Sequence, residues 1–289
     1  MKTPKIASEW RVLFRPEKHG NYVNDHCVYR DLQGKYQLFG ISNFAEGPNA
    51  SGERYFVHGS GDTLSAPLTE VGVAIDRGTL AWAPCVVEKD GCYYMFCGPS
   101  PTSLAVSPDG FEWFGTPVSI EDEPPMAIHR DHFILPYQGG YVMYAAGIKS
   151  AGDGAFRSSI SAAYSEDLLH WRFSGFALTS GSETPLNPAW GAMESPFVVE
   201  KEGIYYLFVT YTNSTKENYH NTLVFASEDP TRFGEYNGGR GGAIPVAVLP
   251  AHAPEIITAN GKDYITTCGW NGYGIPHEGC VSIAELDWE

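Results

Sequence analysis

Positively charged residues are scarce in this chain of 289 residues. Lysine and arginine number 19 against 34 aspartates and glutamates, which gives a formal net charge of −15. No cluster of basic residues interrupts this excess of acid, and a protein of that charge is repelled by nucleic acid and by anionic membrane surfaces. We therefore expect neither as a partner, and the composition favours a neutral small ligand.

Long apolar runs and paired cysteines are also missing. No run reaches the eighteen or so apolar residues of a membrane span, and the N-terminal MKTPKIASEWRVLF lacks the apolar core of a signal peptide. The six cysteines form no CxxC pair and lie in apolar, strand-like runs, as small buried residues do in a reducing compartment. A disulfide between Cys85 and Cys97 stays possible without being required. These absences predict a soluble, cytoplasmic protein.

Helical periodicity is the third absence. No segment repeats its apolar residues at the spacing of about 3.6 over the length of a helix. The chain has instead 32 glycines and 20 prolines, with 13% aromatic and 43% hydrophobic residues. Such a composition supplies many tight turns and a large core, so an all-β fold is expected.

One plan recurs five times along the chain. Each copy has a short polar or charged start, an apolar run, a turn and an aromatic-rich run, as in AMESPFVVEKEGIYYLFVTY at 192–211. The copies are anchored by residues with the same place in the plan: Asp25, Pro84, Asp131, Pro196 and Pro254. They follow one another at roughly 59, 47, 65 and 58 residues, a period typical of β-propellers, whose blades pack on their neighbours. Five copies predict a five-bladed β-propeller in a single domain, 1–289.

The blade boundaries follow from the same plan. Blades are expected at approximately 22–75, 78–120, 126–178, 190–248 and 252–289. The last blade has room for three strands only, whereas WRVLF at 10–14 is strand-like and unassigned. Residues 10–14 could complete that blade, which would close the ring and cover a sheet edge.

Three of the five starts carry an acid: Asp25, Asp131 and Glu194. The first strand of each propeller blade lines the central channel, so these side chains are expected to face one another at one end of it. Three carboxylates brought together repel one another and raise at least one pKa, which a purely structural site does not need. Converging carboxylates without metal or nucleotide motifs are typical of glycoside hydrolysis, where one carboxyl group protonates the departing oxygen and another attacks the anomeric carbon or activates water.

The residues around these acids resemble the signatures of five-bladed propeller glycoside hydrolases. Tyr22-Val23-Asn24-Asp25, Arg130-Asp131 and Glu194-Ser195-Pro196 are similar to W-M-N-D-P-N-G, R-D-P and E-C-P of the family 32 fructosidases, and the family 43 arabinosidases and xylosidases have a looser version. The resemblance spans all five blades. It has departures, since His26-Cys27-Val28 replaces Pro-Asn-Gly and His132 replaces the proline after Arg-Asp. A distant member of this superfamily is indicated.

The resemblance implies a role for each acid. Asp25 would be the nucleophile, as in family 32, or the general base, as in family 43. Asp131 would stabilise the transition state or tune the acid, and Glu194 would be the general acid. The implied substrate is a small carbohydrate with a terminal fructosyl, arabinofuranosyl or xylosyl group. No cofactor is expected, although many family 43 enzymes hold a cation such as calcium on the axis, which here could lie near His252 or His277.

Other residues near the blade starts suit the walls of a sugar site. Flat aromatic faces stack on sugar rings, and the resemblance adds an arginine that binds sugar hydroxyls. A glycine- and proline-rich insert at 43–52, with Phe44 and Glu46 as weaker candidates, could overhang the pocket. Glu255 is a reserve proton donor. The candidate substrate-binding residues are Asn24, Trp82, Arg130, Trp190, His252 and Trp270.

Two other functions fit part of this pattern. A propeller glycoside phosphorylase would need basic residues for phosphate, which Arg130 and a histidine could supply, but phosphorylases of this shape typically lack the acid of the first blade, and Asp25 is present. A non-catalytic sugar-binding propeller would not require three carboxylates. The sugar, the linkage, the stereochemical course, exo or endo cleavage and the oligomeric state stay open.

Overall fold

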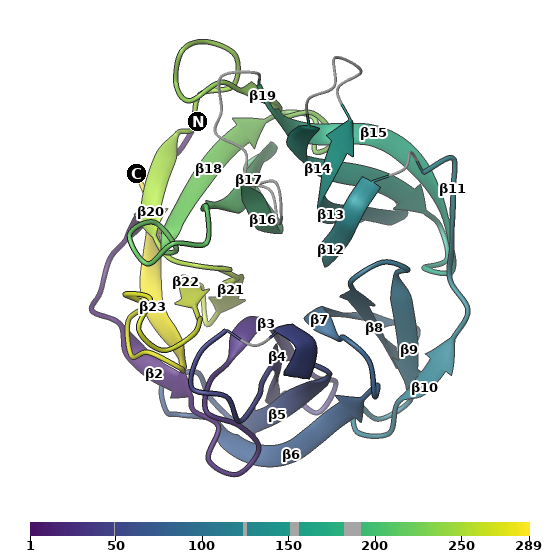
Figure 1. The fold of residues 1–289 in the computed structure, drawn as a ribbon, viewed down its shortest axis with the longest axis vertical. Helices are drawn as coiled ribbons and strands as arrows, with labels where there is room; N and C mark the ends of the chain where they lie inside the picture. The colour runs from purple at the N-terminus through teal and green to yellow at the C-terminus, as the bar shows by residue number, and fades with distance from the viewer. Residues whose placement is uncertain (49, 124–125, 151–155, 182–191) are drawn as a thin grey trace.

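The computed structural model describes residues 1–48, 50–123, 126–150, 156–181 and 192–289. In these residues the strands form five mainly antiparallel sheets that stand around a central axis, and each sheet is one blade of a ring (Figure 1). The all-β, five-bladed propeller predicted from the repeats is confirmed.

Each blade runs from an innermost strand at the axis to an outer strand. Blade 1 consists of β3 (Asn24–Arg30), β4 (Tyr36–Ile41), β5 (Tyr55–Gly61) and β6 (Thr69–Asp76). Blade 2 consists of β7 (Trp82–Lys89), β8 (Cys92–Gly98), β9 (Ser103–Ser107) and β10 (Phe114–Thr116). The connection between β4 and β5 carries a single turn of 3-10 helix, η1 (Ala50–Gly52).

The remaining blades repeat this order. Blade 3 has the longest strands: β12 (Met126–Tyr137), β13 (Gly140–Ser150), β14 (Phe156–Ser165) and β15 (His170–Ser180). Blade 4 consists of β16 (Met193–Lys201), β17 (Ile204–Tyr211), β18 (Asn221–Ser227) and β20 (Ala247–Pro250). The apolar runs of the sequence become the middle strands. All six residues of β4 are buried, for example, because neighbouring blades cover both faces of its sheet.

Blade 5 joins the two ends of the chain. Its inner strands are β21 (Ile256–Ala259), β22 (Lys262–Thr267) and β23 (Val281–Trp288). Two N-terminal strands, β1 (Pro4–Ile6) and β2 (Arg11–Phe14), both pair antiparallel with β23. The N-terminal segment therefore covers the outer edge of the last blade and links it to blade 1 (Figure 1).

Two short strands cross the expected blade boundaries. β11 (Ser119–Glu121) begins inside the range expected for blade 2, but it pairs in parallel with β15 of blade 3. β19 (Gly234–Tyr236) lies inside the range expected for blade 4, and it also pairs in parallel with β15. The expected ranges 78–120 and 190–248 therefore each include a short strand that belongs to the sheet of blade 3. These two strands, β11 and β19, cover the outer edge of that sheet.

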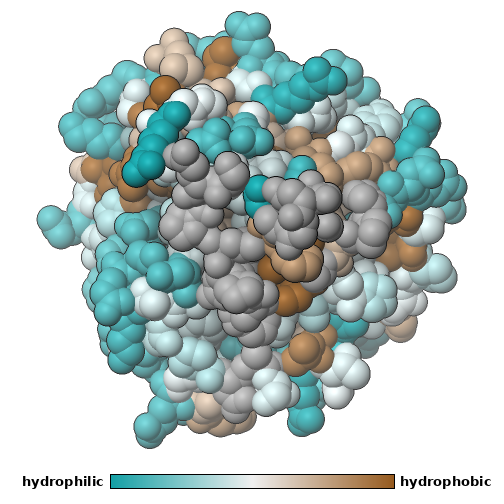
Figure 2. Space-filling model, turned by 45° about the horizontal axis from the view of Figure 1, so that its top comes forward, coloured by the Kyte–Doolittle hydropathy of each residue, from teal (hydrophilic) through white to brown (hydrophobic). Residues whose placement is uncertain are grey.

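The surface is polar, and most cysteines are inside. Hydrophilic residues cover most of the face seen in Figure 2, where hydrophobic residues form small, separate patches. All six cysteines are free thiols and five of them are buried, so no disulfide joins Cys85 to Cys97. In the described part of the chain, no helix has the length and apolar character needed to cross a membrane.

Ring closure by β2 can be tested through Leu13, whose side chain is fully buried in a cluster with residues of blades 1 and 5. Leu13→Ala is expected to lower the free energy of unfolding by about 2–5 kcal/mol, because it removes buried methyl groups and leaves a cavity. Leu32→Ala, at a position 59% exposed, is the control and should change it by less than about 0.5 kcal/mol. Chemical denaturation measures both. Equal, small effects would show that β2 does not pack into the ring.

Candidate active site

Every blade has a residue in the left-handed backbone region within its innermost strand or shortly before it. The φ angles are 40°, 47°, 58°, 51° and 45° for Asp25, Ala83, Asp131, Ser195 and Ala253. Residues other than glycine seldom adopt this conformation, so its presence in all five blades shows that it belongs to the structural repeat. In blades 1 to 4 the pairing register with the second strand also shifts at this residue, as expected for a β-bulge.

The bulges arrange the side chains in layers along the axis. The residues before the left-handed positions form the outer layer: Asn24, Trp82, Arg130, Glu194 and His252. Four of these, with Asp25 and Asp131 of the second layer, line a pocket of about 330 Å³. The residues after the left-handed positions line a smaller, deeper space of about 30 Å³: His26, Pro84, His132, Pro196 and Pro254.

The layers correct one detail of the sequence alignment. Asp25 and Asp131 occupy equivalent left-handed positions, but their equivalent in blade 4 is Ser195. Glu194 lies one residue earlier, so the three acids are not at matched positions of the repeat. They nevertheless meet in one pocket, because the bulge turns two successive side chains toward the axis.

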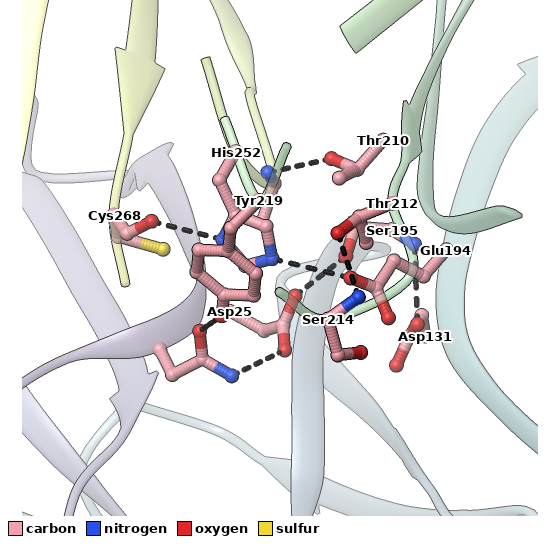
Figure 3. A network of polar contacts seen from close by, with 12 residues as sticks. Asp25, Asp131, Glu194, Ser195, Thr210, Thr212, Ser214, Tyr219, His252 and Cys268 are labelled. Carbon is pink, nitrogen blue, oxygen red and sulfur yellow. Dashed lines mark hydrogen bonds and ion pairs between the residues drawn. The ribbon is translucent and has the colours of Figure 1, made fainter. Parts of the chain in front are cut away.

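Ser195 connects the carboxylates of blades 1 and 3. Its Oγ donates a hydrogen bond of 2.6 Å to Oδ1 of Asp25, and its backbone N–H donates one of 3.1 Å to Oδ2 of Asp131 (Figure 3). Asn24 donates a further bond of 3.1 Å to Oδ2 of Asp25. The sequence resemblance included Ser195 in its third motif but gave it no function. In the structure it fixes the positions of two carboxyl groups.

Arg130 separates the other pair of acids. Its Nη2 lies 2.9 Å from Oε2 of Glu194 and its Nε lies 3.3 Å from Oδ2 of Asp131. The arginine and Asp131 side chains are 6% and 4% exposed, so solvent screens these contacts little. The remaining terminal nitrogen, Nη1, is buried and has no hydrogen-bond partner within the described residues.

His252 is the second cation partner of Glu194. Its Nδ1 lies 2.9 Å from the carbonyl oxygen of Cys268 and its Nε2 lies 3.4 Å from Oε1 of Glu194. A carbonyl oxygen only accepts, so Nδ1 carries a proton. The contact between Nε2 and the carboxylate then needs one more proton, located on either group. Burial opposes charge on His252, yet its hydrogen bond with Glu194 raises the pKa of the imidazole above its ordinary value.

The three acids differ in how readily they ionise. Burial and the neighbouring charge of Asp131 raise the pKa of Asp25 to about 7. Burial also raises the pKa of Asp131, although Arg130 opposes the shift. Burial acts on Glu194 as well, but the hydrogen bond to His252 and the charge of Arg130 hold its pKa below its ordinary value. The pocket therefore contains carboxyl groups whose protonation differs at neutral pH, the arrangement that acid–base catalysis uses.

Aromatic side chains form the opposite wall, together with one acid that sequence reasoning missed. Trp82, Trp270 and Tyr273 line the pocket, and so does Glu53, which directly follows the insert at 43–52. Pro48 of that insert reaches the pocket. Phe44 and Glu46 are exposed and do not line it.

The predicted site residues are thus placed as follows. Seven of them line the pocket together, and His252 lies behind Glu194. Trp190 lies outside the described residues. Glu255 was expected at the mouth and is not there: it lines the deeper space, its Oε2 accepts a bond of 2.6 Å from the Val28 N–H, and burial raises its pKa to about 8. The seven are Asn24, Asp25, Trp82, Arg130, Asp131, Glu194 and Trp270.

The axial cation was expected near His252 or His277, but His252 contacts Cys268 and Glu194 and His277 contacts Ser282. Both ring nitrogens of His26 are occupied, by the sulfur of Cys268 and the hydroxyl of Thr266. Across the described ranges, no three histidine, cysteine, aspartate or glutamate side chains come together in a way that could hold a metal ion. These residues do not fit a cation held by several side chains, and no chemical step is assigned to one.

Comparison with known proteins identifies the fold. No protein-family model and no curated protein matches the chain. Among solved structures, it is similar to a GH43 β-xylosidase/α-arabinofuranosidase from a compost microbial metagenome in complex with xylotriose (20% identity, 98% of this chain and 95% of that one, TM-score 0.65). It is also similar to a thermostable family-43 glycoside hydrolase (19%, 95% and 92%, TM-score 0.68).

A third similar structure comes from the other family of the resemblance. The GH32 β-fructofuranosidase of Bombyx mori, in complex with sucrose, is 16% identical, with a TM-score of 0.67 over 96% of this chain. The chain spans 62% of the length of that enzyme. At these identities the comparisons show that the chain shares the five-bladed propeller fold.

The raised pKa of Asp25 can be measured directly. In a ¹³C NMR titration of protein labelled at aspartate carboxyls, one signal is expected to titrate near pH 7. Ser195→Ala should move that pKa higher, because the lost hydrogen bond stabilises the ionised form. Ser227→Ala, on the outer part of blade 4, is the control and should leave it in place. Titration of every aspartate below about pH 5 would contradict the described electrostatics.

Proposed function

We propose that this chain is a glycoside hydrolase that removes a terminal fructosyl, arabinofuranosyl or xylosyl group from a small carbohydrate. One observation carries the proposal: Asp25, Asp131 and Glu194 come from three blades and line a single pocket with aromatic walls. The pocket volume, about 330 Å³, lies at the lower end of the range for small-molecule sites. Structures with the same fold bind xylotriose and sucrose, which supports a sugar ligand here.

Glu194 and His252 are the proton donor in this proposal. The proton that they share passes from Glu194 to the glycosidic oxygen as the bond between that oxygen and the anomeric carbon breaks. Arg130 holds Oε2 of Glu194, so Oε1, which faces His252, is the oxygen that loses and regains the proton.

Asp25 meets the positive charge that develops on the anomeric carbon. It either attacks this carbon, or takes a proton from the water that does so, and both routes require the ionised carboxylate. Ser195 and Asn24 donate to its two oxygens and thereby orient it. Asp131 adds negative charge beside it, which stabilises an oxocarbenium-like transition state.

Hydrolysis fits the pocket better than phosphorolysis. A phosphorolytic enzyme must bind inorganic phosphate next to the anomeric carbon. Arg130 is the one arginine or lysine that lines the pocket among the described residues, and two carboxylates already pair with it. Negative charge dominates the site, so a phosphate anion would be repelled.

The first test combines a substrate panel with Glu194→Gln. Nitrophenyl α-L-arabinofuranoside and β-D-xylopyranoside, with sucrose, are expected to include a substrate that is cleaved without added phosphate. Glu194→Gln should reduce kcat roughly a hundredfold or more, because the donor is lost, and should keep the affinity for the sugar. Glu200→Gln, an exposed position on the same strand, is the control.

Two results would overturn this proposal. Turnover that depends on inorganic phosphate would identify a phosphorylase. Sugar binding without turnover of any member of the panel, unchanged by Glu194→Gln, would identify a non-catalytic binding protein.

The pH profile tests the assigned roles. Asp25 must be ionised, so activity should rise as the pH passes through about 7. The pair of Glu194 and His252 must keep its proton, so activity should fall once the pH exceeds the raised pKa of His252. The expected profile is a bell whose acidic limb reflects Asp25 and whose alkaline limb reflects the pair of Glu194 and His252. A maximum in the acidic range, lost above about pH 7, would show that Asp25 is the donor and Glu194 the base.

A further inference from the structure

Glu53 is a pocket acid that the proposed chemistry does not use. It precedes β5 in blade 1. Its side chain is almost completely buried, with 2% of the residue exposed, yet it lines the pocket. A carboxyl group is seldom buried to this extent unless it is paired or hydrogen-bonded.

The partners of Glu53 are aromatic and neutral. The Tyr22 hydroxyl donates a hydrogen bond of 2.8 Å and the Trp270 indole one of 3.1 Å, both to Oε1. Burial raises the pKa of Glu53, while its interactions with Tyr22, Trp270 and Trp82 oppose the shift. Both hydrogen-bond partners at Oε1 are donors, so Glu53 serves as an acceptor. A carboxylate has about four acceptor sites, so these two donors leave capacity for a further one.

A purely structural role explains this arrangement poorly. The carbonyl oxygen of a neutral amide can accept from one phenol and one indole, at a lower desolvation cost than a carboxylate incurs. The carboxylate also lies where ligand atoms can reach it, between Trp82 and Trp270 in the pocket lining. A strong acceptor between flat apolar faces is suited to a ligand with hydroxyl groups around an apolar ring.

The aromatic wall links Glu53 to the proton donor. Trp270 stacks on Tyr219 with 4.9 Å between ring centroids, and Tyr219 stacks on His252 at 3.8 Å. Tyr219 also donates a bond of 2.5 Å to Oδ1 of Asn24, and Figure 3 shows its ring against that of His252. A ligand held at Glu53 is thus positioned relative to Glu194 through packed rings rather than through mobile chains.

We propose that Glu53 is the specificity-determining residue of this pocket, accepting a hydrogen bond from one hydroxyl group of the terminal sugar while the sugar ring lies against Trp82 and Trp270. The inference rests on the proposed sugar hydrolysis for its substrate. It adds a contact that selects among sugars by the presence and direction of that hydroxyl. Glu53 is a binding and positioning residue and takes no part in proton transfer.

The test uses Glu53→Gln with substrates that lack one ring hydroxyl at a time. Glu53→Gln should lower kcat/KM for the best substrate roughly ten- to a hundredfold, because a hydrogen bond to a charged acceptor is lost. In the unmodified protein one deoxy analogue should be cleaved much more slowly than the others. In Glu53→Gln that difference should largely disappear. Glu46→Gln, an exposed glutamate in the neighbouring insert, is the matched control.

A structural role would give another result. If Glu53 only holds the indoles, Glu53→Gln lowers activity on every analogue by the same factor, and this outcome overturns the inference. Glu53→Asp is the second variant and applies if the glutamine variant does not fold. It keeps the negative charge but shortens the side chain by one methylene group. The loss of discrimination among the deoxy analogues is expected to be the same as for Glu53→Gln.

A binding measurement separates this inference from the proposed hydrolysis. Xylose, arabinose and fructose are titrated against tryptophan fluorescence, since Trp82 and Trp270 line the site. If no glycoside is cleaved, but one sugar binds and Glu53→Gln weakens it at least tenfold, hydrolysis fails and the role of Glu53 stands. If glycosides are cleaved, and Glu53→Gln changes neither binding nor the analogue pattern, hydrolysis stands and the role of Glu53 fails.

Discussion

The left-handed residue in or shortly before each innermost strand is the constraint on which the site depends. Such a conformation costs a residue other than glycine on the order of 1–3 kcal/mol, and it is tolerated best by aspartate and asparagine. Two of the five positions hold aspartate, Asp25 and Asp131. At the others the surroundings enforce it. The N–H of Ala253, for example, is bonded to Thr210 and that of Ser195 to Asp131. Without the kink, successive side chains would point to opposite faces of the sheet.

The distribution of charge around this kink is uneven, and the unevenness creates distinct chemical roles. Four carboxyl groups line the pocket, but both cations of the cluster, Arg130 and His252, contact Glu194. Glu194 is therefore stabilised as an anion next to a proton carrier. Asp25 receives hydrogen bonds from neutral groups only, and its pKa rises. One pocket thus holds a carboxyl group with a raised pKa, Asp25, and one with a lowered pKa, Glu194. The sequence alone does not distinguish them.

The sequence predicted the fold and most pocket residues because both depend on repetition. A strand pattern that recurs five times specifies five blades, and polar residues at the blade starts must face the axis. The alignment of the repeats was one residue off in three blades, where it was anchored on prolines. The left-handed residue lies one position earlier in those blades, and nothing in the sequence marks it. Glu53 and Tyr219 were missed because they lie in connections without counterparts in other blades. β11 and β19 were missed because each has only three residues.

Closure of the ring connects these observations. The line of contacts from Glu53 through Trp270, Tyr219 and His252 to Glu194 uses side chains of blades 1, 5 and 4. Blades 1 and 5 meet where the ends of the chain meet, so their relative position depends on β2, which pairs with β23 and packs against blade 1. The N-terminal strand contributes no group to the pocket. It nevertheless packs between blades 1 and 5, which carry Glu53 and its partner Trp270.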